Sequence, residues 1–355
     1  MRELKIDDFR NVRALARTLV GVTPNPSYGD PSTVQLKRDI DRSMRRKPFR
    51  VFSFPSPIAT TVEDFITTEI AREMVSALDT FVRLLSFGAA LDGPHFNVWG
   101  NDLALWTDLC PWTEYLCLFS DNSASITLTP GRVGELLFRA TESVVNVLHC
   151  IAMISPVIAS SVAFAFDCAV IRTTVRMYLY WPVVYGDEPE DDSKLTRALV
   201  CSSTLPTLNR IMTYSAAALG VILRAVSYHP RRLYRRVAMH IRMALRLNGD
   251  ARLQLVITEM IHLATMSSTP ALRARRCPRC VTSALVAVLR TYRDPASGNE
   301  EDPFFVAYNT LADICTLDSR VTLHAIQKGV FTILASVTTL RPQRDIERLV
   351  SCIKD

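Results

Sequence analysis

Apolar residues recur at three- and four-residue spacing along most of the chain after its first 60 positions. The first long stripe runs from Phe65 to Leu85 and predicts a helix of about seven turns. Thr61 followed by Asp64 resembles a capping box at the start of this helix. Gly88 and then Asp92-Gly93-Pro94 are expected to end it, because glycine often follows the last turn of a helix.

The same periodicity continues toward the carboxyl end, interrupted by short polar or proline-containing turns. Residues 97–119 are predicted to form two helices separated at Pro111, because proline disrupts a helix interior. Further helices are expected at 193–202, 206–228, 230–247, 250–266, 278–293, 303–317, 318–328, 330–340 and 343–353. No run shows the alternation typical of strands, so the sequence predicts an all-α fold. Because so many helices exceed what one bundle holds, an α-solenoid is favoured, with stacked helices wound into a right-handed superhelix.

The first 59 residues differ from the rest of the chain in their predicted secondary structure. Short helical stretches there alternate with prolines, which restrict the residue before them to extended conformations. We therefore expect an N-terminal arm with short helices over 1–59 and a helical repeat domain over 60–355. The acidic segment at 186–192 marks a place where the repeat domain is expected to divide.

The stretch from Ser143 to Phe166 carries no charged residue and is long enough to be tested as a membrane span. It also contains Ser155-Pro156, which is typical of an N-cap followed by proline at the first helical position. That dipeptide would divide the stretch into two helices that are each too short to cross a bilayer. A buried helical hairpin is therefore favoured over a membrane helix.

A repeat is clearest between Phe304 and Leu340, where two helices joined by a short polar turn are followed by Gly329 and a third helix. This unit resembles an armadillo repeat. In that family a glycine makes the sharp turn before the last helix, and the matching core positions here are Ala325, Ile326, Val330, Ile333 and Leu334. A shift of 49 residues upstream gives a weaker echo at Leu255, Val256, Ile257, Val281, Leu285, Val286 and Val288. The resemblance covers the last part of the chain and implies a scaffold that binds other proteins.

The tryptophan-rich segment and the degenerate helical repeats also resemble the N-terminal helical regions of fungal proteins that end in a MYND-type zinc finger. The paired cysteines of the finger itself are absent from this sequence. No metal ligand is therefore implied by that resemblance. Trp99, Trp106, Trp112 and Tyr115 are expected to pack in the core.

Motifs of catalysis are missing from the sequence. There is no G-x-S-x-G, no G-x-x-x-x-G-K and no G-x-G-x-x-G, and the six histidines do not cluster along the chain. His149 and His262 lie on apolar helices and are expected to be hydrogen-bonded core residues. The sequence predicts a non-enzymatic protein without a cofactor or a small-molecule substrate.

Cysteine usage points to a reducing compartment. The nine cysteines are an odd number and lie mostly within apolar helical stretches. With a charged amino-terminal segment, this favours an intracellular protein of the cytoplasm or nucleus. Cys277 and Cys280 form a C-x-x-C, for which zinc binding and redox chemistry stay open. Coincidence is favoured, because no further ligands follow at the usual spacing.

Arginine is the strongest chemical feature of the sequence. The chain has a formal net charge of +6, and fourteen arginines stand against Asp250 and Glu259 between Arg224 and Arg293. The candidate partner-binding residues are Arg231, Arg235, Arg242, Arg246, Arg273 and Arg276. An acidic protein segment is the expected partner, and a nucleic-acid backbone is the alternative. A solvated face without a partner would produce the same pattern.

Overall fold

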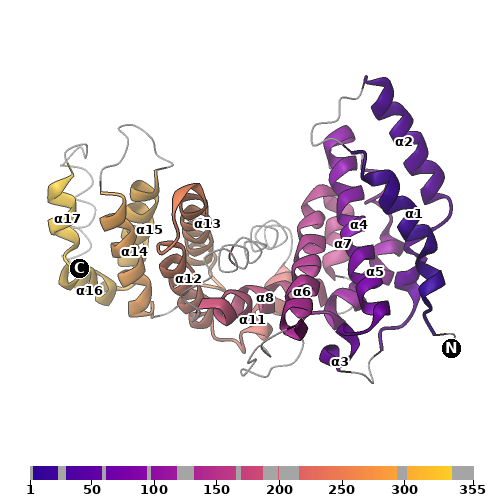
Figure 1. The fold of residues 1–355 in the computed structure, drawn as a ribbon. Helices are drawn as coiled ribbons and strands as arrows, with labels where there is room; N and C mark the ends of the chain where they lie inside the picture. Colours follow the sequence, from indigo (N-terminus) through magenta and orange to yellow (C-terminus); the bar gives the residue numbers. More distant parts are fainter. Residues whose placement is uncertain are drawn as a thin grey trace. The chain divides into compact units, whose positions relative to one another are not determined.

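A computed structural model describes residues 3–22, 29–57, 61–93, 97–117, 132–164, 169–186, 199, 216–274, 276–293 and 302–337. The ordered elements of these residues are all helices, with no strand among them, so the all-α prediction is confirmed. The chain divides into two compact units (Figure 1). Unit 1 comprises residues 1–180 and 210–221, and unit 2 comprises residues 181–209 and 222–355. The helices predicted at 193–202 and 343–353 lie outside the described residues, apart from position 199.

Unit 1 is built from short and long helices around one apolar core. Its elements are η1 (Ile6–Phe9), α1 (Arg10–Leu19), α2 (Pro31–Met44), η2 (Pro48–Ser53), α3 (Val62–Ile66), α4 (Glu69–Asp92), α5 (Leu103–Tyr115), α6 (Arg132–Cys150), η4 (Ile151–Met153) and α7 (Pro156–Phe164). Helices α8 (Ala169–Gly186) and α11 (Ala216–Ala225) lie across the boundaries between the units. The long helix α4 packs against α1 and α6.

The predicted N-terminal arm is part of this core. Phe9, Leu15 and Ile40 are fully buried, and Phe49 and Phe52 of η2 stack on each other against Phe81 of α4. The prolines do interrupt the helices as expected, but the apolar residues between them pack onto α4 because burial stabilises them. The first segment therefore folds with unit 1 and does not stand apart.

The predicted helix from Thr61 is two helices. Thr61 caps α3 by accepting from the Asp64 N–H at 3.2 Å, as the capping box predicts, and Thr68 caps α4 by accepting from the Ala71 N–H. Gly88 does not end α4. The helix ends at Asp92 with Gly93 as its C-cap, at the second of the two predicted stops. A β-carbon at Gly88 would meet the Asn97 side chain at 2.5 Å, so this glycine allows Asn97 to approach the helix closely.

Helix α5 contradicts the predicted break at Pro111, because it runs through this proline from Leu103 to Tyr115. The exposed proline removes one N–H from the helix, but its neighbours Cys110 and Trp112 are buried and hold the turn in place. The aromatic segment is core, as predicted. Trp99, Trp106 and Trp112 are all buried, and Tyr115 is half-buried.

The uncharged stretch from Ser143 is divided as the sequence predicts. Helix α6 ends at Cys150, and α7 begins at Pro156 after the short η4. Among the described residues one helix, α4, is long and apolar enough to cross a membrane, and 50% of its most apolar window is buried inside the protein. Met74, Leu78 and Phe81 of this helix lie in the core of unit 1.

Unit 2 consists of helices that pack in two layers. Its elements are α12 (Arg231–Ala244), α13 (Gly249–Ser268), α14 (Arg279–Thr291), α15 (Pro303–Leu317), α16 (Ser319–Gln327) and α17 (Val330–Ser336). Helix α14 packs against α12 and α16 in one layer, while α13 packs against α15 in the other (Figure 1). Contacts of α12 with α13 and of α14 with α15 join the layers.

The ends of these helices follow from local sequence. Asp302 caps α15 by accepting from the Phe304 N–H at 2.9 Å, and Pro303 occupies the first helical position. Gly329 adopts a left-handed conformation with φ of 81° between α16 and α17. The predicted sharp turn at this glycine is therefore confirmed. Glycine suits this position because the left-handed region disfavours residues with a side chain.

Candidate functional site

Helix α12 carries the densest group of basic side chains in the described part of the chain. Arg231, Arg232, Arg235 and Arg242 are exposed, and Arg246 is exposed in the turn that follows the helix. Between them lie the buried positions that face the core: Leu233, Tyr234, Val237, Ala238, His240, Ile241, Met243 and Ala244. The helix is therefore sharply divided into a core side and an arginine side, as the predicted spacing indicates.

The neighbouring helices of the same layer extend this charge pattern. Arg279 and Arg290 are exposed on α14, and Arg320 is exposed on α16. None of α12, α14 and α16 contains an aspartate or glutamate within its bounds. The other layer differs, because α13 carries one exposed acid, Asp250, beside one arginine, Arg252, and α15 carries the exposed Asp313. We call the exposed side of α12, α14 and α16, with Arg246, the basic face.

Two arginines of the basic face are held by backbone carbonyls of the next helix. Arg242 donates to the Cys280 carbonyl of α14 at 3.4 Å, and Arg290 donates to the Lys328 carbonyl after α16. A third cross-helix contact joins Ser283 Oγ to His324 Nε2 at 3.3 Å. These contacts fix how the three helices of the layer lie beside one another.

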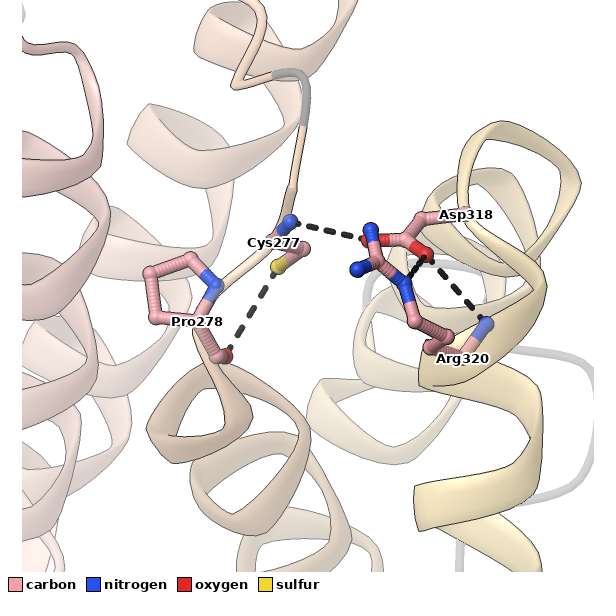
Figure 2. A network of polar contacts seen from close by, with 4 residues as sticks. All are labelled: Cys277, Pro278, Asp318 and Arg320. Carbon is pink, nitrogen blue, oxygen red and sulfur yellow. Dashed lines mark hydrogen bonds and ion pairs between the residues drawn. The ribbon is translucent and has the colours of Figure 1, made fainter.

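The start of α16 is also tied to the segment before α14 (Figure 2). Asp318 Oδ2 accepts from the Cys277 N–H at 3.1 Å, while Asp318 Oδ1 accepts from the N–H and Nε of Arg320. Asp318 forms an ion pair with Arg320 of the basic face, with Nε and Oδ1 3.0 Å apart. It therefore reduces the positive charge at the α16 edge of the basic face.

The arrangement of charge on α12 works against helix stability. Arg231 and Arg232 lie in its first turn, where the helix dipole disfavours positive charge. Arg231 with Arg235, and Arg232 with Arg236, are four residues apart, a spacing at which like charges repel by about 0.2–0.5 kcal/mol. Features that weaken local structure without a local gain concentrate at functional sites. This observation favours a binding role for the basic face over a merely solvated surface.

The predicted contact residues do not all lie on this face. Arg231, Arg235, Arg242 and Arg246 do. Arg273 and Arg276 are exposed in the connection between α13 and α14, outside the three helices, and Arg273 donates to the Ser267 carbonyl at 3.0 Å. The structure adds Arg279 and Arg290, which the sequence placed in the basic stretch but not among the contact residues.

The C-x-x-C is not arranged as a metal centre. Cys277 precedes α14 and Cys280 lies in its first turn. Among the described residues no group of His, Cys, Asp or Glu side chains is placed to hold a metal ion. Burial, together with the nearby charge of Asp318, raises the pKa of Cys277 to about 12, which disfavours the reactive thiolate.

A buried acid–histidine cluster lies under the arginine side of α12. The Glu259 carboxylate lies 3.1 Å from His240 Nδ1 and 3.4 Å from His262 Nδ1. All three side chains are buried, with 1% or less exposed. Burial raises the pKa of Glu259, but the charges and hydrogen bonds of the two histidines oppose this and lower it to about 2. The carboxylate is therefore ionised and links α12 to α13.

His262 is the hydrogen-bonded core histidine that the sequence predicts. Its pairing with His240 through Glu259 was missed, since the histidines are far apart in sequence. The one available signal was the three-residue spacing of Glu259 and His262 on an otherwise apolar helix side.

Comparisons with known proteins add little to this geometry. No protein-family model matches the chain, and no curated protein matches it. Two crystal structures of engineered proteins are similar to it. One has 14% identity and a TM-score of 0.39 over 83% of this chain and 99% of its own. The other has 12% identity and a TM-score of 0.25 over 97% of this chain and 99% of its own. Similarity this low carries no inference about function.

Proposed function

We propose that the protein is a non-enzymatic interaction scaffold of armadillo-like helical repeats, and that unit 2 binds an acidic segment of a partner protein on the basic face. The observation that carries this proposal is the segregation of charge between the two helix layers. Adjacent helices α12, α14 and α16 carry outward arginines and no acidic residue, and they do so at a cost to the stability of α12.

The repeat architecture is supported by the two-layer packing in unit 2 and by the turn at Gly329. Helices α15, α16 and α17 supply the three helices of one armadillo-like unit. The weaker upstream match has only α13 and α14, because the described residues between Ser268 and Arg279 form no helix. The missing middle helix accounts for the weaker match of that unit.

An acidic protein segment is favoured over nucleic acid by the chemistry of the face. Proteins that bind single strands stack bases on aromatic side chains, and no exposed aromatic residue lies on α12, α14 or α16. Arginine binds carboxylates through two parallel hydrogen bonds. The basic face can therefore bind an acidic peptide without aromatic side chains.

Charge reversal tests the proposal. The full-length variant Arg235→Glu/Arg242→Glu/Arg246→Glu should bind a labelled glutamate-rich peptide on the order of 100-fold more weakly than the wild type, because each favourable pair becomes a repulsive one. Fluorescence anisotropy at low salt measures the affinity, and circular dichroism checks that the variant stays helical.

The matched control is Arg38→Glu/Arg45→Glu/Arg50→Glu in unit 1, where all three arginines are exposed. It changes the net charge by the same amount and should retain most of the binding. Equal losses in both variants would show that binding follows net charge alone and would contradict the proposed site. Tighter binding of an equally charged oligonucleotide, with a steep fall in added salt, would favour nucleic acid instead.

A further inference from the structure

The basic face is not uniformly polar. Leu323 on α16 is 58% exposed, and Met239 on α12 and Ala287 on α14 are half-buried. A single exposed leucine is ordinary on a protein surface. Here each of the three adjacent helices places an apolar side chain among the polar positions of its outer side, and that recurrence is what calls for an explanation.

Leu323 is not needed by the core of unit 2. The buried positions of α16 are Val321, Thr322 and Ala325. Arg320 lies one turn before Leu323 on the same side of the helix. His324 follows Leu323 directly, and its contact with Ser283 places this turn next to α14. The exposed leucine therefore lies at the junction of two helices of the basic face.

The outer side of α14 is formed by short side chains. Ser283 and Ala287 are half-buried there, and Arg279 and Arg290 lie toward its two ends. Short side chains allow the backbone of a bound segment to approach this helix more closely than it can approach the arginine-covered α12. A segment crossing the layer would then meet arginines and apolar side chains alternately.

Two of these arginines are already oriented. Arg242 and Arg290 each donate to a backbone carbonyl of the next helix, and a guanidinium has five N–H donors, so further donors stay available for a carboxylate. An arginine that is held in place loses less conformational freedom on binding. This arrangement suits carboxylates at defined positions along a segment.

We propose that the segment bound by the basic face is acidic and amphipathic, with apolar residues between its carboxylates and at least one of them packed against Leu323. This inference rests on the proposed function and specifies its partner. A uniformly acidic chain, or a phosphate backbone, would leave Leu323 without an apolar contact.

Two peptides of equal length and equal negative charge test the inference. One has leucines between its glutamates, and the other has serines at those positions. The leucine peptide should bind full-length wild type about fivefold to tenfold more tightly, because part of one apolar side chain leaves water. Leu323→Ser should remove most of that difference and leave the affinity for the serine peptide unchanged.

Leu253→Ser is the matched control, because Leu253 is a partly exposed leucine of α13 in the other layer. It should preserve the preference for the leucine peptide. Equal binding of both peptides to the wild type would overturn this inference and leave the proposed function standing. A preference that survives Leu323→Ser would also overturn it. Failure of both peptides to bind would overturn the proposed function as well.

Discussion

Replacing Glu259 with alanine is expected to destabilise the α12–α13 pair by about 3 to 5 kcal/mol at neutral pH, the cost typical of removing one partner from a buried charged cluster. The carboxylate is 1% exposed and lies between His240 and His262. Its loss would leave two buried imidazoles without their acceptor and create a cavity at the contact of the two helices.

Native-state hydrogen exchange of the α12 and α13 amides is the appropriate measurement. Trp99, Trp106 and Trp112 all lie in unit 1, whereas α12 and α13 lie in unit 2. Tryptophan fluorescence would therefore report mainly on unit 1. The matched control is Gln254→Ala, at an exposed position of the same helix, which should leave exchange nearly unchanged. A change below about 1 kcal/mol for Glu259→Ala would contradict a stabilising role for the cluster.

The same cluster gives a pH dependence with a defined sign. The pKa of Glu259 lies at about 2 in the folded protein, below the ordinary glutamate value of 4.5. The stabilisation from this carboxylate is therefore fully present above pH 4.5 and is lost as the pH falls through 2. The stability difference between wild type and Glu259→Gln should shrink over this interval.

Replacing Trp112 with alanine is expected to destabilise unit 1 by about 3 to 5 kcal/mol. The side chain is 1% exposed, and its Nε1–H donates to the carbonyls of Phe52 at 3.1 Å and Phe54 at 3.0 Å. The ring also packs against Phe65 and Tyr115. Its removal would leave a cavity and two carbonyls without their donor, and would loosen η2 from α5.

Trp112→Phe separates the two contributions. It retains an aromatic ring and should cost about 1 to 3 kcal/mol through the lost hydrogen bonds. Urea unfolding followed by far-ultraviolet circular dichroism measures both variants, with Leu103→Ala at the exposed start of α5 as the control. Similar midpoints for Trp112→Ala and Leu103→Ala would contradict the role assigned to Trp112.

The helices of unit 2 were predictable because their ends depend on local chemistry. Asp302-Pro303 begins α15 and Gly329 separates α16 from α17, and both signals act within a few residues. Gly88 and Pro111 misled the prediction for unit 1, because tertiary packing decides their roles. Asn97 fills the space beside Gly88, and the buried neighbours of Pro111 keep α5 continuous.

The candidate site was predictable in its chemistry but not in its extent. The spacing of arginines on α12 could be read from the sequence. That α14 and α16 extend the same face depends on which helices are neighbours, and this is set by packing between residues far apart in the chain. The contacts of Arg242 with Cys280 and of Arg290 with Lys328 each span 38 positions.

The most direct test of the central claim is to map where an acidic, leucine-containing peptide binds the full-length protein by hydrogen exchange. A segment that crosses the basic face should slow exchange in α12, α14 and α16 and leave α13, α15 and unit 1 unchanged. Protection confined to α13 and α15, or to unit 1, would contradict the assignment of the basic face as the binding surface.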